Sequence, residues 1–158
     1  MKLLFAADEY IAQWVEQRAK YCKFENYSAI GVLDEERLIA GIIYHSYLPD
    51  FGNIEMSIAT ESPRWASRRI IAALLRYPFM QLGCQRITAC IPASNKKSLR
   101  LNLGLGFKIE GYVRRGYGDD DLIVTGLLRE DAAIWFKEKN SGKISAESPR
   151  STRSNSNS

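Results

Sequence analysis

The sequence predicts a single domain of the α/β class, in which helices pack against one mixed sheet. The chain of 158 residues is long enough for one hydrophobic core and leaves little room for a second. Its apolar fraction of 46% and charged fraction of 25% are ordinary for a folded protein and exclude wholesale disorder. The apolar pattern then changes repeatedly between strand and helix periods, in the order strand, helix, three strands, helix, strand, helix, two strands.

The N-terminal part is predicted to hold a short strand over residues 1–7 and then a helix of about four turns. Asp8 is the predicted N-cap of this helix, and Glu9 adds favourable negative charge to its first turn. Apolar residues recur at helical spacing along it, and Ile11, Val15 and Tyr21 are among them.

Three strands follow. The segments SAIGVLD and LIAGIIYHSYL, separated by the charged DEER, predict an antiparallel hairpin. NIEMSIAT is the third strand, with Ile54, Met56 and Ile58 on a packed face. Glu55 and Ser57 point to its more polar face.

The second half of the chain alternates between helices and strands. Apolar residues repeat every three or four positions over residues 70–82, which predicts an amphipathic helix. Pro78 should bend or shorten it, because proline removes a backbone hydrogen bond. After the strand RITACIPA, Asn95 is the predicted cap of a third helix, which Gly104 and Gly106 weaken and end.

The segments FKIEGYVRRGY and DLIVTGLLRE form a closing hairpin across GDDD, and a short helix, DAAIWFKEK, completes the body. The domain therefore covers residues 1–140. The Ser-rich segment 141–158 is predicted to be a disordered basic tail.

Charge and composition narrow the class of protein further. The net charge is +4, of which the tail contributes +2 through three basic residues against one acidic residue. The remaining domain lacks the bulk positive field of a dedicated nucleic-acid-binding protein, although a local basic patch or the tail leaves such contacts open. Three cysteines without CxxC spacing predict neither a disulfide framework nor a zinc site. With no membrane-spanning run and no signal-peptide core, we expect a cytoplasmic protein without a membrane partner.

Arginines stand at the predicted start of the second helix, where positive charge is unfavourable. Arg64, Arg68 and Arg69 would each cost a few tenths to about 1 kcal/mol beside the positive end of the helix dipole. A bound anion removes the conflict, because free N–H groups and guanidinium groups together suit a phosphate. The alternative is that these arginines extend into water or pair with acidic neighbours.

Lys96 and Lys97 follow the Asn95 cap and repeat this arrangement at the third helix. Two adjacent anion sites would suit a cofactor with several phosphates. A solvated helix end with flexible lysines is the alternative.

Three longer stretches carry a more specific signal: LLRYPFMQLGCQRITACI, NKKSLRLNLGLGFKIEG and YVRRGYGDDDLIVTGLLRE. They combine a helix ending in F-x-x-L-G, an Asn-x-x-Ser helix ending in L-G-F, and a last strand ending in G-L-L-R-E. Over residues 53–130, close to half of the chain, the sequence resembles the GNAT superfamily of acetyl-coenzyme A dependent N-acyltransferases. Within that superfamily it is most similar to the branch that acetylates protein N-termini and ribosomal proteins.

The resemblance implies a mixed, mostly antiparallel sheet, flanked by helices, in which the central strands NIEMSIAT and RITACIPA splay apart. Acetyl-coenzyme A would be the co-substrate, with its pantetheine arm in the opening. The loop before the second helix corresponds to the family's pyrophosphate loop, Asn95 to the asparagine near pantetheine, and Ser98 lies one helical step further. The implied cofactor-binding residues are Arg64, Trp65, Ala66, Ser67, Arg68, Arg69, Asn95 and Ser98.

Two features depart from the family pattern. The family loop is rich in glycine, whereas this chain has no glycine from residue 54 to residue 81. Either the arginines compensate for the missing glycines or the site is degenerate. The tyrosine that often protonates the leaving thiolate falls on Asn102, which leaves no obvious general acid.

Acetyl transfer to an amine also needs a group that accepts a proton. Glu55 is the predicted base, acting directly or through a water, and an exposed strand carboxylate is the alternative. His45, the single histidine, has a suitable pKa and is the second choice. Asp119, Asp120 and Asp121 either attract a cationic amine or form a solvated turn, and Trp65 either flanks the cofactor or belongs to the core.

The sequence therefore predicts an enzyme that transfers an acetyl group from acetyl-coenzyme A to a primary amine, with a protein or peptide preferred as acceptor. Small amines such as antibiotics or polyamines stay open, as does a homodimer. The rival prediction is a non-catalytic binding module on the same fold, which holds coenzyme A or uses its arginines and basic tail on nucleic acid.

Overall fold

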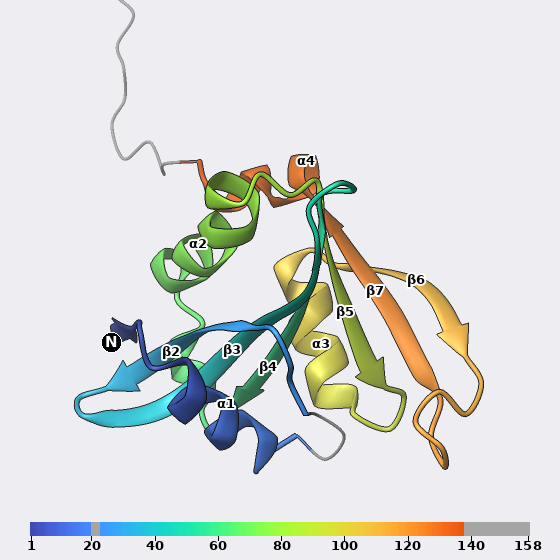
Figure 1. Ribbon diagram of the computed structural model, residues 1–158, viewed down its shortest axis with the longest axis horizontal. Helices are drawn as coiled ribbons and strands as arrows, with labels where there is room; N and C mark the ends of the chain where they lie inside the picture. The colour runs from blue at the N-terminus through green and yellow to red at the C-terminus, as the bar shows by residue number, and fades with distance from the viewer. Residues whose placement is uncertain (20–22, 138–158) are drawn as a thin grey trace, which may run out of the picture.

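The computed structural model describes residues 1–19 and 23–137. Within them, seven strands form one sheet in the order β1-β2-β3-β4-β5-β7-β6 (Figure 1). Neighbouring strands run antiparallel except β4 and β5, which run parallel. The predicted mixed, mostly antiparallel α/β architecture is confirmed.

The strands are β1 Lys2–Leu4, β2 Ser28–Asp34, β3 Arg37–Leu48, β4 Asn53–Thr60, β5 Arg86–Pro92, β6 Lys108–Val113 and β7 Leu122–Leu128. The helices are α1 Asp8–Glu16, α2 Arg68–Arg76, α3 Lys96–Leu105 and α4 Arg129–Ala132. Short turns of other helix types cover Pro63–Trp65, Tyr77–Gln81 and Ala133–Trp135. The order of elements agrees with the one predicted from the apolar pattern.

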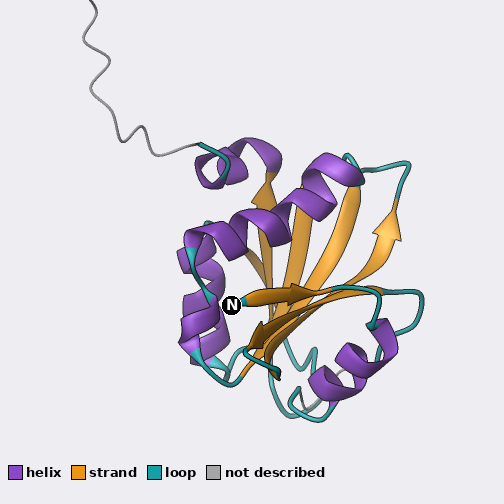
Figure 2. Ribbon diagram, turned by 90° about the vertical axis from the view of Figure 1, so that its left-hand side faces the viewer, coloured by secondary structure: helices purple, strands orange, loops and turns teal. Residues whose placement is uncertain are grey.

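The sheet separates two hydrophobic clusters, because successive strand residues point to opposite faces. Ile11 and Val15 of α1 pack on one face against Ile43 of β3. The larger cluster lies on the other face, where α2 and α3 cover Met56 and Ile87. Figure 2 shows α1 on the other side of the sheet from the remaining helices. On the face that carries α1, this helix covers β2 and β3, and the residues of β4 and β5 at the centre of the sheet stay half-buried.

The first helix differs from its prediction. Asp8 is the first helical residue and not the N-cap, which is Ala7 and makes no side-chain capping bond. Asp8 Oδ1 instead accepts a hydrogen bond from the backbone N–H of Ala29 on β2, at 3.3 Å. The helix ends at Glu16, well short of four turns. Tyr21, which was expected to continue its apolar stripe, lies outside the described residues.

The other helices follow the sequence closely. The α2 helix ends at Arg76, and a π-helical turn containing Pro78 replaces its last predicted turns. Asn95 caps α3, since its side chain accepts a hydrogen bond from the Ser98 N–H at 3.1 Å. Gly106 ends α3 in the left-handed conformation, with φ of 107°.

The C-terminal part of the body is shorter than DAAIWFKEK suggests, because α4 and its 3₁₀ turn end at Trp135. The predicted disordered tail, residues 141–158, lies outside the described residues. Among the described residues, no helix is both long and apolar enough to cross a bilayer.

Candidate active site

The two parallel strands at the centre of the sheet pair over only three residues. Asn53, Ile54 and Glu55 of β4 lie opposite Arg86, Ile87 and Thr88 of β5. Beyond these pairs β4 continues along β3 to Thr60, while β5 continues along β7 to Pro92. The strands diverge visibly in Figure 1, so the sheet opens into a wedge.

The wedge contains a cavity of about 270 Å³, which we call the strand cavity. Its lining comes from both diverging strands, from the start of α3, from the end of the α1 segment and from the β6–β7 turn: Arg18, Ala19, Met56, Ser57, Ile58, Ala89, Cys90, Ile91, Pro92, Ser94, Asn95, Ser98 and Tyr117. A second cavity of about 330 Å³, the loop cavity, shares Arg18, Ala19, Ile58, Asn95 and Ser98 with it. The loop cavity extends from there to the segment between β4 and α2.

The segment between β4 and α2 is held by caps and a buried ring in place of glycines. Ser62 accepts a hydrogen bond from the Arg64 N–H at 3.3 Å and so caps the 3₁₀ turn Pro63–Trp65. The Trp65 side chain is 1% exposed, belongs to the core and also borders the loop cavity. Ser67 caps α2 by accepting from the Ile70 N–H. Proline and a buried ring thus fix a loop that glycine would leave free.

The three arginines at this helix entrance point to separate places. Arg64 is largely exposed and lies 3.4 Å from the carboxylate of Asp34, the last residue of β2. Arg68 donates to backbone carbonyl groups that follow α4. Arg69 donates to the Met1 carbonyl oxygen at 3.4 Å. The guanidinium groups therefore do not converge on one anion site, and a role for them in cofactor binding stays a prediction.

The remaining predicted binding residues are gathered more closely. Trp65, Ala66, Asn95 and Ser98 all border the loop cavity, and Asn95 and Ser98 border the strand cavity too. Lys97 adds a cation to the loop cavity, whereas Lys96 borders neither cavity. These residues come from the segment before α2 and from the start of α3, which are far apart in the sequence but border one cavity.

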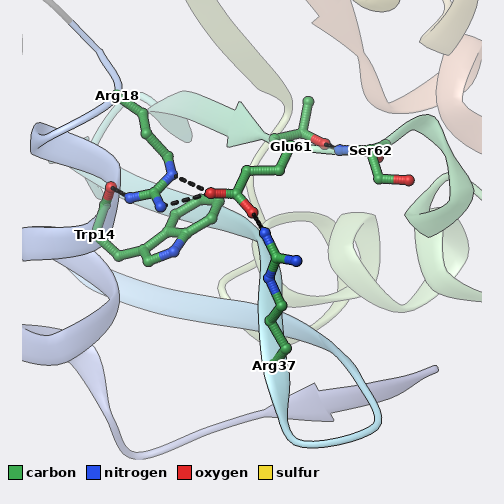
Figure 3. Close-up of polar contacts among 6 residues, drawn as sticks. Trp14, Arg18, Arg37, Glu61 and Ser62 are labelled. Atoms are coloured by element: carbon green, nitrogen blue, oxygen red, sulfur yellow. Dashed lines mark hydrogen bonds and ion pairs between the residues drawn. The ribbon is translucent and has the colours of Figure 1, made fainter.

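Arg18 borders both cavities and was not singled out by the sequence. It follows α1, and its Nε and Nη2 atoms donate to Glu61 Oε1 at 3.0 and 2.6 Å. Arg37 donates to the other carboxylate oxygen of Glu61 at 2.6 Å. Hydrogen bonds from Arg18 and Arg37 lower the pKa of Glu61. Figure 3 shows Glu61 between the two guanidinium groups, with Ser62 next in the chain.

Trp14 completes the support of Arg18. Its backbone carbonyl accepts from Arg18 Nη1 at 3.0 Å, and the guanidinium carbon lies 3.8 Å from the centre of the indole ring. This cluster ties the end of α1 to the start of the loop after β4. No sequence pattern could reveal it, because Arg18 and Glu61 are 43 residues apart.

The base predicted from the sequence has unexpected neighbours. Glu55 and His45 face each other across β3 and β4, and Glu55 Oε2 is 3.2 Å from His45 Nδ1. His45 Nε2 is 3.0 Å from Ser57 Oγ. Glu55 borders neither cavity, whereas Ser57 borders the strand cavity. The sequence named Glu55 and His45 as separate candidates, and the strand register joins them.

Burial shifts the pKa values of two side chains in this cluster, His45 and Cys90. Desolvation lowers the pKa of His45, and the negative charge of Glu55 offsets part of that effect. Cys90 Sγ lies 3.9 Å from Glu55 Oε1, and burial together with that carboxylate raises the pKa of Cys90 to about 11. Cys90 is therefore a neutral thiol at physiological pH and a poor nucleophile.

The acidic turn and the asparagine at the family's tyrosine position have structural contacts. Asp120 accepts from the Ser94 hydroxyl and N–H, and Asp121 accepts from the Arg115 N–H at 2.8 Å. The same turn places Tyr117 at the strand cavity, a phenol that the sequence did not indicate. Asn102 donates to the Ser98 carbonyl oxygen at 2.8 Å and borders neither cavity.

Comparison with known proteins gives matches in structure only. No protein-family model and no curated protein matches the chain. A solved structure of a provisionally assigned acetyltransferase is 22% identical over 70% of this chain, with a TM-score of 0.61. This chain spans 61% of that structure's length. A second provisionally assigned acetyltransferase, from T. thermophilus, is 21% identical over 77% of this chain and 70% of its own, with a TM-score of 0.61.

A spermidine N-acetyltransferase, a chimera of SpeG from Vibrio cholerae and hSSAT, superposes with a TM-score of 0.67. It is 16% identical and is matched over 87% of this chain and 100% of its own. These neighbours do not single out the ribosomal-protein branch, which stays a prediction. The resemblance seen in the motifs is confirmed for the architecture: this chain has the GNAT fold of the acetyltransferases.

Proposed function

We propose that this protein is an N-acetyltransferase that transfers the acetyl group of acetyl-coenzyme A to a primary amine. The observation that carries the proposal is the wedge between β4 and β5, whose cavity continues into a second one beside the α2 entrance. A long, thin pantetheine arm suits the first cavity, and the phosphates of coenzyme A suit the second. Together the two cavities fall within the range of about 300–1,000 Å³ that is usual for small-molecule sites.

The chain's own groups fit such a ligand. The aliphatic side chains of Met56, Ile58 and Ile91 offer an apolar wall to the arm. Lys97 borders the loop cavity and can balance phosphate charge. The N–H groups at the start of α2 have the same preference for an anion, because they lie at the positive end of a helix dipole. The glycine-free loop is compatible with this role since Ser62, Pro63 and Trp65 hold its backbone in place.

The chemistry is an attack by a neutral amine on the thioester carbonyl, followed by loss of the thiolate. A proton must leave the amine as the new C–N bond forms. Glu55 is the predicted acceptor of that proton, but its carboxylate contacts His45 and Cys90 and borders neither cavity. A path from the cavity to Glu55 therefore has to use an intervening group.

The acceptor that we propose is a primary amine on a protein or peptide. The resemblance to the branch that acetylates protein N-termini and ribosomal proteins implies this choice. The solved spermidine N-acetyltransferases make a polyamine the main competitor. Isotopically labelled acetyl-coenzyme A, incubated with a cell extract, with peptides and with spermidine, separates these classes by mass spectrometry of the products. Label on peptide amines supports the proposal, and label on spermidine alone overturns the peptide acceptor while leaving the acetyltransferase in place.

Binding of acetyl-coenzyme A can be tested directly by a substitution that fills the two cavities of the wedge. Ser98 borders both cavities, so the indole ring of Ser98→Trp should fill their junction. We expect calorimetry to show acetyl-coenzyme A binding to the wild type and at least a tenfold weaker Kd for Ser98→Trp, which is about 1.4 kcal/mol. Leu103→Trp is the matched control, because Leu103 is on the same helix, is exposed and borders neither cavity.

Two results would contradict the proposed binding of acetyl-coenzyme A in the wedge. An absence of binding at millimolar acetyl-coenzyme A defeats the enzyme proposal, and equal affinities for the two tryptophan variants place the ligand elsewhere. Tight binding without turnover on any amine would favour the non-catalytic module instead.

A further inference from the structure

Three polar side chains from β3 and β4 are linked in a row beside the strand cavity. His45 and Glu55 are paired across the two strands, and Ser57 is two residues further along β4, on the same face as Glu55. The row runs from Glu55 Oε2 to His45 Nδ1 at 3.2 Å, and from His45 Nε2 to Ser57 Oγ at 3.0 Å. Of these three residues, Ser57 is the one that borders the cavity.

The neighbours of His45 fix which ring nitrogen carries the proton. A carboxylate 3.2 Å away would repel the lone pair of an unprotonated Nδ1, so Nδ1 carries the hydrogen and Glu55 stabilises that tautomer by its charge. Ser46 Oγ, at 3.0 Å from Nδ1, accepts this hydrogen. The Nε2 lone pair is then free to accept from the Ser57 hydroxyl. The hydroxyl group therefore points its hydrogen at a base.

The imidazole is kept in its neutral form. The His45 side chain is 18% exposed, and its ring lies against Phe24 with 5.2 Å between ring centres. Desolvation holds the pKa of His45 below the ordinary 6.5, although Glu55 acts in the opposite direction. In the part of the chain that the structure describes, the other ionisable group touching the row is Cys90, which is a neutral thiol. A neutral imidazole at physiological pH can accept a proton.

The backbone beside the row is unusual as well. The β3–β4 register shifts between His45 and Leu48, and Ser46 has a φ of 52°. A non-glycine residue rarely adopts this left-handed conformation, and such irregularities often re-aim a side chain next to an active site. Here the irregularity places the Ser46 hydroxyl beside Nδ1 of His45.

We propose that Ser57 and His45 form a proton relay during acetyl transfer and that Glu55 positions the imidazole, an inference that rests on the proposed function. The neutral amine attacks the thioester carbonyl carbon, the C–N bond forms, and the carbonyl π electrons move to oxygen. The amine proton passes to Ser57 Oγ while the Ser57 proton passes to His45 Nε2. The oxyanion then re-forms the C=O bond and the C–S bond breaks, so the thiolate leaves with the electron pair of that bond and takes the proton back through Ser57. The products are an amide and the free thiol of coenzyme A, and the relay is restored.

The first test needs no activity. His45 is the single histidine of the chain, so its imidazole nitrogen signals in an NMR titration of the untagged protein are unambiguous. We expect hydrogen on Nδ1, an unprotonated Nε2 and a pKa below 6.5. Glu55→Gln should lower this pKa further, because it removes the negative charge that favours the imidazolium. Hydrogen on Nε2 in the neutral wild type would overturn the relay, since Nε2 could then accept nothing from Ser57.

The second test follows turnover. With any amine that is acetylated, Ser57→Ala should lower kcat on the order of 100-fold, while Ser57→Thr, which keeps a hydroxyl, should retain most of it. His45→Gln should cost about as much as Ser57→Ala, and the double variant no more, because both residues serve one path. The acid limb of the wild-type pH profile should lie below pH 6.5, move lower in Glu55→Gln and vanish in His45→Gln.

The results of these experiments distinguish a failure of the proton relay from a failure of the proposed acetyltransferase function. Calorimetry on the same variants should give acetyl-coenzyme A affinities within about threefold of the wild type, and a wild type that does not bind overturns both proposals. Binding and turnover with an unaffected Ser57→Ala variant overturn the relay alone. The relay is also overturned if Glu55→Gln loses activity while His45→Gln stays active, because Glu55 would then be the base itself. An acetyl group trapped on Ser57 without acceptor would show a nucleophile in place of a relay.

Discussion

Asn95 has two roles at the residue scale that substitutions can separate. Its side chain caps α3, and the residue also borders both cavities. Asn95→Ala should lower the free energy of unfolding by about 1 kcal/mol, because the Ser98 N–H loses its acceptor. Asn95→Asp keeps an oxygen in the same place and should leave stability within about 0.5 kcal/mol of the wild type. Urea denaturation of both variants measures the difference, and an unaffected Asn95→Ala would mean that the cap contributes nothing.

Local signals of this kind were the most predictable part of the site. Asn95 could be identified because its capping partner is three residues away. Asp8 looked equally suited to cap α1, but its carboxylate binds the Ala29 N–H on another element. A short-range pattern gives no weight to such a distant partner, and the predicted cap was wrong for that reason.

The row of Glu55, His45 and Ser57 is a second case in which a contact between distant residues could not be predicted from local sequence. The sequence indicated Glu55 and His45 as candidate bases but gave Ser57 no role. The alternation of NIEMSIAT correctly put Glu55 and Ser57 on one face. Their pairing with His45 depends on the β3–β4 register, which shifts at an irregular site near Ser46. That register is a property of the folded hairpin and not of any short window of sequence.

At the scale of elements, close packing of α1 on β3 requires Gly41. A Cβ atom there would lie 2.6 Å from Val15 Cγ2 and 3.1 Å from Ile11 Cγ2. Gly41→Ala should therefore destabilise the fold by about 1–3 kcal/mol, as overpacked cores do. Gly104 is the control within α3, since an added Cβ meets nothing within 4 Å. Gly104→Ala should stabilise the protein by about 0.5–1 kcal/mol.

Thermal or urea unfolding of the two alanine variants checks the opposite signs. A neutral Gly41→Ala would mean that α1 does not approach β3 as closely as described. The sequence alone identified Gly104 as a weak point of its helix but gave no reason to notice Gly41, because the clash involves a helix 26 residues earlier in the chain.

For the molecule as a whole, the order of elements and the splayed centre were predictable, the first from periodicity and the second from the family resemblance. The hydrogen-bond and ion-pair partners of the three arginines before and in α2 could not be predicted. Arg68 and Arg69 donate to carbonyl groups near the two ends of the described chain, and Arg64 faces Asp34. These acceptors offset the unfavourable charge at the α2 entrance, for which the sequence left two explanations open, a bound anion or exposed arginines paired with acidic neighbours.

The wedge divides the sheet into two parts joined by three residue pairs, β1 to β4 on one side and β5 to β7 on the other. Because each part has its own antiparallel pairing, the opening can be held without strain on either strand. This arrangement places Ser57 of β4 and Cys90 of β5 on facing walls of one cavity. The function of the protein therefore depends on what occupies that cavity.

A crystal structure of the complex with coenzyme A shows most directly what occupies the strand cavity. We predict that the pantetheine arm lies between residues 56–58 of β4 and 89–91 of β5, with its thiol end near Ser57. The phosphates should lie at the loop cavity beside Ala66 and Lys97. Coenzyme A bound outside the wedge, with β4 and β5 unoccupied between them, would contradict it.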